Sequence, residues 1–167
     1  MRERKRTALA LALLATAAML SVAAPAMAAG AIQVSGDTAA ATCDAPPAGY
    51  EAYTDYSFAI DGDLTGCVYG QITVARFHEG SGTYQEVANE VFTGYWNGQH
   101  GTLEMIENYT AKAGADNLTG LYFARCKHPI VTDSGTGVFY GVSGRLDFKD
   151  DTSVGTAAYT GHLRWAG

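Results

Sequence analysis

The chain has 167 residues, with 11 Lys and Arg against 17 Asp and Glu, a formal net charge of −6. This length is enough for one domain with its own hydrophobic core. The acidic balance excludes nucleic acid as an expected partner, because affinity for nucleic acid comes mainly from cationic side chains that neutralise phosphates.

The first 28 residues have the three parts of a secretory signal peptide in the right order. A basic segment from Arg2 to Arg6 precedes an Ala- and Leu-rich apolar run over residues 8–24, and Ala26-Met27-Ala28 matches the small-residue cleavage site. An N-terminal membrane anchor is the alternative, but the run is short for a span. The pattern looks bacterial, and we expect a secreted or extracytoplasmic protein that has left the membrane after cleavage.

Cleavage changes the charge of the protein. The leader carries four basic residues and one acidic residue, so the mature chain keeps 7 basic and 16 acidic residues and a net charge of −9. No basic cluster survives, which argues against nucleic acid and against an anionic membrane surface.

Three cysteines remain, and an oxidising compartment makes one disulfide expected. Cys67 and Cys126 both lie in strand-like segments, whereas Cys43 lies in an irregular leader, so the sequence favours a Cys67–Cys126 pair. Cys43–Cys67 is the alternative. The third thiol is then either buried or available to link two chains, which leaves a homo-oligomer open.

After the leader, residues 29–49 are small and polar, with two adjacent prolines, and predict a flexible N-terminal arm. From residue 50 to 167, runs rich in Val, Ile, Thr, Tyr and Phe alternate with Gly, Asp and Asn clusters, which is typical of strands and turns. The Asn97-Gly98 pair predicts a hairpin, because both residues tolerate positive φ. Strands are expected near 51–60, 65–77, 84–94, 101–113, 118–126, 138–149 and 155–165, with a short one near 129–132.

No segment of the mature chain keeps a helical period. Residues 102–113 are the segment most compatible with a helix, but their side chains alternate as in a strand. The alternating residues are Leu103, Met105, Glu107, Tyr109 and Ala111. About eight strands joined by short connections predict an all-β, antiparallel barrel or sandwich. A barrel has the advantage of leaving no open edges.

The last two strands each alternate an apolar and a polar face. The apolar sets are Leu146 with Phe148 and Tyr159 with Leu163 and Trp165; the polar sets are Arg145 with Asp147 and His162 with Arg164. A charged face is usually solvated, but inside a barrel it would form a polar site. The alternation alone does not say which face points inward.

Residues 135–148, Gly-Thr-Gly-Val-Phe-Tyr-Gly-Val-Ser-Gly-Arg-Leu-Asp-Phe, are the most distinctive segment. Their Gly-x-Gly-x-Phe-x-Gly-x-x-Gly pattern resembles a segment of allene oxide cyclase-like and dirigent-like β-barrels. Residues 125–164 also look like a group of uncharacterised secreted bacterial proteins. The resemblance implies a single closed antiparallel barrel of eight strands with an apolar interior, which in the plant cyclases binds a fatty-acid epoxide and steers ring closure. The glycines themselves indicate a tight structural corner.

Six residues are candidates for chemistry. Histidine is the side chain best suited to act as an acid or base near neutral pH, so His128 is a candidate. A loop histidine held by a backbone carbonyl is the alternative. Glu90 shares a face with Phe92 and Trp96, and an acid among aromatic rings has a raised pKa. The other four candidates are Arg145, Asp147, His162 and Arg164. These side chains either bind a carboxylate or phenolate at a barrel mouth or form an Arg–Asp pair that ties two strands together.

We expect no metal and no cofactor, because the four histidines lack the close spacing of a zinc site and no hydrolase motif is present. The sequence therefore favours a secreted barrel that binds a small apolar ligand or a protein partner without catalysis. A cofactor-independent isomerase or cyclase of the allene oxide cyclase type is one alternative. A structural or inhibitory secreted module is another.

Overall fold

The computed structural model describes residues 30–113, 121–151 and 156–165. The predicted signal peptide, residues 1–28, lies outside the described residues, as do the predicted turn at 114–117 and the start of the strand expected at 118. Within the described part, no helix is both long enough and apolar enough to span a membrane.

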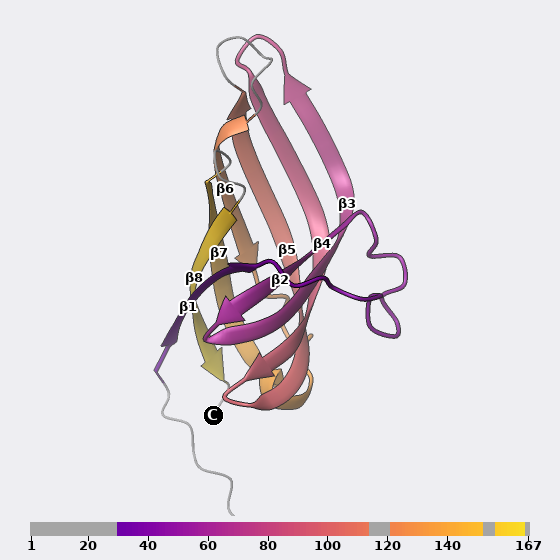
Figure 1. Ribbon diagram of the computed structural model, residues 1–167, viewed down its shortest axis with the longest axis vertical. Helices are drawn as coiled ribbons and strands as arrows, with labels where there is room; N and C mark the ends of the chain where they lie inside the picture. The colour runs from indigo at the N-terminus through magenta and orange to yellow at the C-terminus, as the bar shows by residue number, and fades with distance from the viewer. Residues whose placement is uncertain (1–29, 114–120, 152–155, 166–167) are drawn as a thin grey trace, which may run out of the picture.

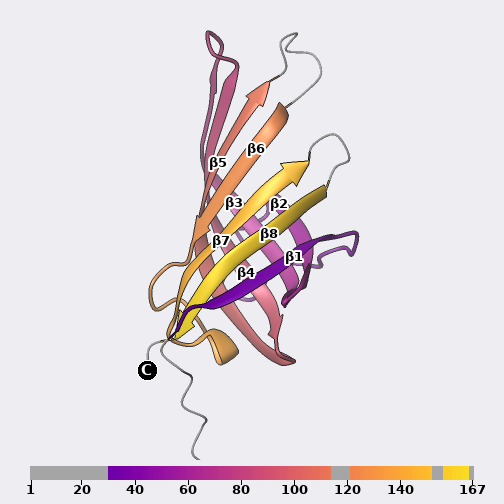
Figure 2. The same ribbon diagram turned by 90° about the vertical axis from the view of Figure 1, so that its left-hand side faces the viewer.

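Eight antiparallel strands follow one another around a closed barrel, and each strand pairs with its neighbours in sequence (Figure 1). The barrel closes where β1 pairs with β8, as the side view shows (Figure 2). This confirms the predicted all-β barrel. The strands are β1 (Ile32–Ala39), β2 (Tyr56–Gly62), β3 (Leu64–His78), β4 (Thr83–Trp96), β5 (Gln99–Ala113), β6 (Leu121–Pro129), β7 (Val142–Asp151) and β8 (Thr156–Trp165).

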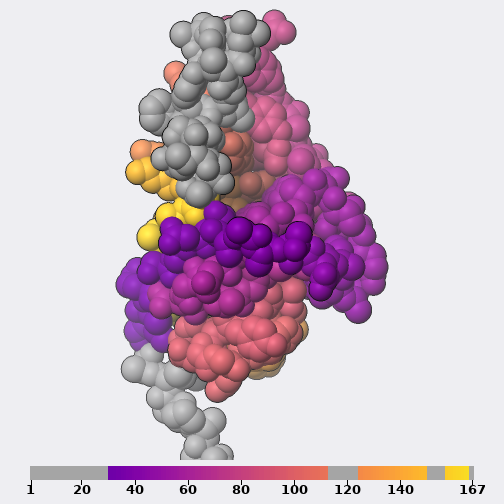
Figure 3. Space-filling view, in the orientation of Figure 1, coloured from indigo at the N-terminus to yellow at the C-terminus, as the bar shows by residue number. Residues whose placement is uncertain are grey.

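The prediction of a flexible arm over residues 29–49 was wrong for β1. Gly36 in β1 pairs with Gly62 in β2 on one side and with Tyr159 in β8 on the other, so this segment closes the barrel. Its small residues have a packing reason: a Cβ added to Gly36 would lie 2.1 Å from the Asp61 carbonyl oxygen. Residues 30–60, indigo to purple, form a band across the middle of the face in Figure 3.

The favoured Cys67–Cys126 disulfide was also wrong. Cys43 pairs with Cys67, the alternative pairing, and ties the segment between β1 and β2 to the outside of β3. Cys126 lies on the opposite surface of the sheet, in the barrel interior, where it is 4 % exposed. The two cysteines predicted to pair therefore face different sides of the barrel wall.

Most of the turns form where the sequence predicted them. Asn97 and Gly98 have φ of 50° and 74° and form the predicted β4–β5 hairpin turn. The glycine-rich corner is confirmed by positive φ at Gly137, Gly141 and Gly144. Its first residues, however, form a 3₁₀ turn, η1 (Gly137–Phe139), so β7 begins at Val142 and not at 138. The short strand expected at 129–132 is reduced to a single bridge between Ile130 and Met105.

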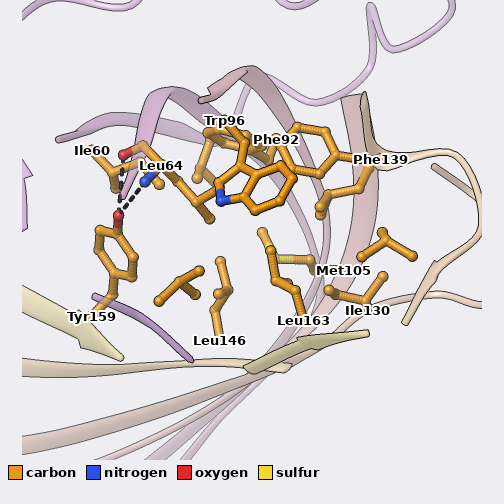
Figure 4. Packing of buried hydrophobic residues seen from close by; sticks show 14 of the residues in the cluster. Ile60, Leu64, Phe92, Trp96, Met105, Ile130, Phe139, Leu146, Tyr159 and Leu163 are labelled. Carbon is orange, nitrogen blue, oxygen red and sulfur yellow. Dashed lines mark hydrogen bonds between the residues drawn. The ribbon is translucent and has the colours of Figure 1, made fainter. Parts of the chain in front are cut away.

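One end of the barrel, which we call the plugged end, carries the 97–98 turn and η1 at the bottom of Figure 1. Phe139 of η1 is fully buried and packs edge-on against Phe92 at 5.7 Å. Trp96 stacks on Trp165 at 4.6 Å, and the Tyr159 hydroxyl accepts the Leu64 N–H (2.8 Å) and donates to the Leu64 carbonyl (3.1 Å) (Figure 4). Side chains thus fill this half of the barrel.

The packing also resolves which faces of the last strands point inward. Leu146, Phe148, Tyr159 and Leu163 are buried in the core. The opposite, polar faces therefore lie on the outside of the barrel. At the other end, which we call the cavity end, the β3–β4 hairpin and strands β5 and β6 rise above the rest of the barrel (Figures 1 and 2).

Candidate functional site

A cavity of about 350 Å³ occupies the barrel toward the cavity end. Its volume lies in the range of small-molecule sites. The side chains that line it come from seven of the eight strands, because inward-facing positions recur at every second residue of each strand. They are Thr38, Tyr56, Phe58, Tyr84, Glu86, Glu107, Tyr109, Cys126, His128, Phe148 and Ala157.

The cavity has apolar walls. Phe58 and Phe148 meet edge to face at 5.5 Å, and Tyr109 lies edge to face with Tyr84 at 6.1 Å. The small side chain of Ala157, at the start of β8, completes this wall. Apolar walls with a few placed polar groups are the usual composition of a ligand pocket.

Polar side chains gather on one wall of the cavity, and Tyr56 lies at their centre. Its hydroxyl is 2.8 Å from Oε1 of Glu90 and 3.0 Å from Oε2 of Glu107. A phenol has one proton, so a single donor serves two buried carboxyl groups. Glu90 is 0 % exposed and Glu107 is 7 % exposed, which makes the pair unusual for a protein interior.

His128 and Cys126, two residues apart on β6, complete the polar cluster. Nδ1 of His128 is 2.5 Å from Oε2 of Glu90, and the Cys126 thiol donates to Oε1 of Glu107 at 3.0 Å. The other ring nitrogen of His128, Nε2, is buried and has no hydrogen-bond partner among the described residues. We call these five residues, Tyr56, Glu90, Glu107, Cys126 and His128, the polar cluster.

The strand register brings the cluster together. Gly70 in β3 pairs with Tyr56 on one side and with Glu90 on the other. A Cβ at Gly70 would lie 2.1 Å from Cζ of Tyr56, so the missing side chain is what lets the tyrosine ring lie across β3. The ring thereby spans a strand and reaches both carboxyl groups.

Burial sets the electrostatics of the cluster. It raises the pKa of the Tyr56 hydroxyl far above its usual value, and the charges of Glu90 and Glu107 act in the same direction. Tyr56 therefore stays a hydrogen-bond donor. Burial also raises the pKa of Glu107, while its hydrogen bond from Cys126 opposes that shift.

The structure divides the six candidate residues predicted from the sequence. Glu90 and His128 lie together inside the barrel, and His128 lines the cavity. The other four lie on the outer face of β7 and β8, where Arg145 forms an ion pair with Asp147 of its own strand at 2.7 Å and is paired in register with His162. These four side chains therefore do not line the cavity, and the Arg145–Asp147 pair joins two positions of one strand and not two strands. A ligand grip at a barrel mouth was one of two interpretations for them, and this placement does not support it.

Three members of the cluster were not among the six residues predicted as candidates for chemistry. Glu107 had a signal, because it interrupts the apolar alternation from Leu103 to Ala111, all of which faces the interior. Burial of an acid on an apolar strand face costs free energy, so its presence there is a signal of a functional role. Tyr56 and Cys126 had no such signal, because their roles depend on pairings across the barrel.

Fold and site together define a class: a closed eight-stranded antiparallel barrel, filled at one end, with an apolar-walled cavity and a buried cluster of ionisable groups at the other. The family model that matches residues 28–161 is described as a protein of unknown function, DUF3224, and the chain belongs to this family. No curated protein matches the chain. No solved structure matches it either.

Proposed function

We propose that this protein binds a small molecule with an apolar body and one hydrogen-bond-donating group inside the barrel. The observation that carries the proposal is the cavity of about 350 Å³, which has aromatic walls and carboxyl groups on one side. The apolar body would lie against Phe58, Tyr109 and Phe148, and the donor group would face Glu107.

The charge of the cavity selects the ligand chemistry. Glu86 and Glu107 both line it, and the described lining contains no Lys or Arg. A ligand carboxylate would meet like charges in a medium of low dielectric, which costs binding energy. An alcohol or an amine instead supplies the donor that a buried carboxylate requires.

A pair of naphthalene probes tests this chemistry. N-phenyl-1-naphthylamine is apolar with one N–H donor, and its 8-sulfonate shares the ring system but carries an anion. Fluorescence titration of the mature protein, with a chelator present, is expected to give saturable binding of the amine at least tenfold tighter than that of the sulfonate. Absent binding of the amine, or equal binding of the sulfonate, would contradict the proposal.

We also propose that residues 1–28 direct export and are removed. The Cys43–Cys67 disulfide supports this, because disulfides persist mainly in oxidising compartments. The intact mass of the protein recovered from outside the cytoplasm of a bacterial host should correspond to a chain beginning at Ala29. A full-length chain retained with the cells would contradict export.

The other functions remain predictions. A cyclase or isomerase would use the same cavity, and a chemically altered ligand recovered after incubation would favour it. A protein partner, or a structural or inhibitory role, would be favoured by a stable complex formed on the outer surface while the cavity stays available to the probe.

A further inference from the structure

We propose that Glu107, Cys126 and His128 form a binding site for a divalent transition metal ion of the Zn²⁺ type. One potential ligand atom from each residue lies within 4.8 Å of the other two, and all three side chains are buried.

The donor set points to the class of metal. Imidazole nitrogen, thiolate sulfur and carboxylate oxygen are the three ligand types that zinc uses in proteins, with bonds of about 2.0–2.3 Å. A cysteine sulfur selects Zn²⁺ over Mg²⁺ and Ca²⁺, which require oxygen ligands. The ligand atoms are already gathered, because all lie within 4.8 Å of one another and the Cys126 sulfur is 3.0 Å from Oε1 of Glu107.

Each nitrogen and oxygen ligand already has the outer partner that metal ligands typically have. A metal-binding histidine almost always donates its other ring N–H to a carboxylate or carbonyl, and Nδ1 of His128 lies 2.5 Å from Glu90. The second oxygen of Glu107, Oε2, accepts the Tyr56 hydroxyl at 3.0 Å. Glu90 and Tyr56 are therefore positioning residues for the two ligands.

A separate observation, the state of the second ring nitrogen of His128, supports a ligand at this position. Nε2 of His128, the nitrogen left over for a metal, is buried in a residue that is 1 % exposed, and it has no hydrogen-bond partner among the described residues. Buried polar atoms are nearly always satisfied. A metal ion would satisfy this nitrogen, and Cys126 would release to solvent the proton that it now donates to Glu107.

From the sequence, the wide spacing of the four histidines predicted no metal site. The proposed ligands instead come from two strands, with Cys126 and His128 at i and i+2 on the inner face of β6 and Glu107 on the neighbouring β5. Three protein ligands leave one position of a tetrahedral site open. All three residues line the cavity, so that position faces it.

The test uses Co²⁺ as a spectroscopic substitute for Zn²⁺, with metal-free mature protein and no organic ligand. We expect one equivalent to bind, with a near-ultraviolet sulfur-to-cobalt band that Zn²⁺ removes by competition. Cys126→Ser is expected to abolish the band, and His128→Gln to weaken affinity by at least tenfold. Glu90→Gln should weaken it by roughly 10- to 100-fold without removing the band, as expected for an outer partner.

The matched control is His162→Gln, which alters a histidine on the outer face and should leave affinity and spectrum unchanged. If a cluster variant fails to fold, the wild type alone still decides the matter, because Zn²⁺ should slow the reaction of Cys126 with a small thiol reagent. Absent saturable uptake, a band that survives Cys126→Ser, or no protection of the thiol would each overturn the proposal. Because no probe is present, this result is independent of the ligand-binding proposal.

Discussion

Tyr56 shows how a single side chain organises the interior of this barrel. Its ring lies across β3 and its hydroxyl reaches Glu90 and Glu107, which come from two further strands. Because burial and both acids raise its pKa, the hydroxyl remains protonated and keeps the two carboxyl groups hydrogen-bonded. The arrangement depends on Gly70, the one position that the ring must cross.

Replacement of Gly70 by alanine should disrupt this arrangement. The added Cβ would lie 2.1 Å from Cζ of Tyr56, so the ring must move away from the two acids. We expect the free energy of unfolding to fall by about 1–3 kcal/mol, the usual cost of overpacking, as measured by urea denaturation. Gly80→Ala is the control, because nothing lies within 4 Å of a Cβ there. Equal effects of the two substitutions would refute the account of Tyr56.

At the scale of the elements, the sequence predicted the strands that carry a clear alternation and a clear turn. The Asn97-Gly98 hairpin is an example, because its positive φ angles are a local property of those residues. β1 was missed, because its small and polar residues look like those of a loop. Gly36 has no side chain because the Asp61 backbone of β2 and the Tyr159 ring of β8, the two flanking strands, approach it closely. No local pattern reports packing against a strand as distant in sequence as β8.

The disulfide pairing was predicted wrongly for the same reason, because it depends on contacts that a local pattern does not report. Cys67 and Cys126 both lie on strands, but the strand face decides pairing: Cys67 faces the segment after β1, whereas Cys126 faces Glu107 in the interior. Facing depends on register, which the sequence did not specify for β6. The polar cluster was missed in part for this reason, since it assembles from residues on β2, β4, β5 and β6.

Loss of the Cys43–Cys67 bond should destabilise the barrel measurably. The bond joins residues separated by 24 positions. In the loop-entropy description, a loop of this length contributes about 3.5 kcal/mol. Cys43→Ser and Cys67→Ser are each expected to lower the free energy of unfolding by this amount, because both remove the same bond. Peptide mapping that recovers Cys126 in a disulfide would contradict the assignment.

At the scale of the whole molecule, the barrel has two structurally different halves. The plugged end is filled by Phe92, Trp96 and Phe139 and supplies the core, while the cavity end keeps space between its walls. A completely filled barrel would be a scaffold only. This division lets one small core stabilise the fold and leave room for the binding site that we propose.

Stability should decline in alkaline solution, because the barrel buries tyrosine hydroxyls. Burial raises the pKa of Tyr159, against the opposing hydrogen bond from Leu64, whereas the tyrosine hydroxyl of the unfolded chain has a pKa of about 10. The unfolded state thus loses this proton first, and the free energy of unfolding should fall as pH rises above about 10. Urea unfolding at a series of pH values measures the slope.

Tyr159→Phe provides the control for that slope. The variant should be less stable at neutral pH by about 1–3 kcal/mol, because it leaves the buried backbone groups of Leu64 without their partner. Its stability should nevertheless fall less steeply than that of the wild type above about pH 10. Parallel curves for the two proteins would show that Tyr159 does not titrate as described.

The central claim is that the cavity inside the barrel binds a small molecule, and two adjacent alanines of β8 test it most directly. Ala157 lines the cavity, whereas Ala158 is exposed on the outer face. In fluorescence titrations with N-phenyl-1-naphthylamine, Ala157→Phe should fill the cavity and weaken binding at least tenfold, while Ala158→Phe should bind like the wild type. Undiminished binding by the Ala157→Phe variant, with its fold intact by circular dichroism, would contradict the claim.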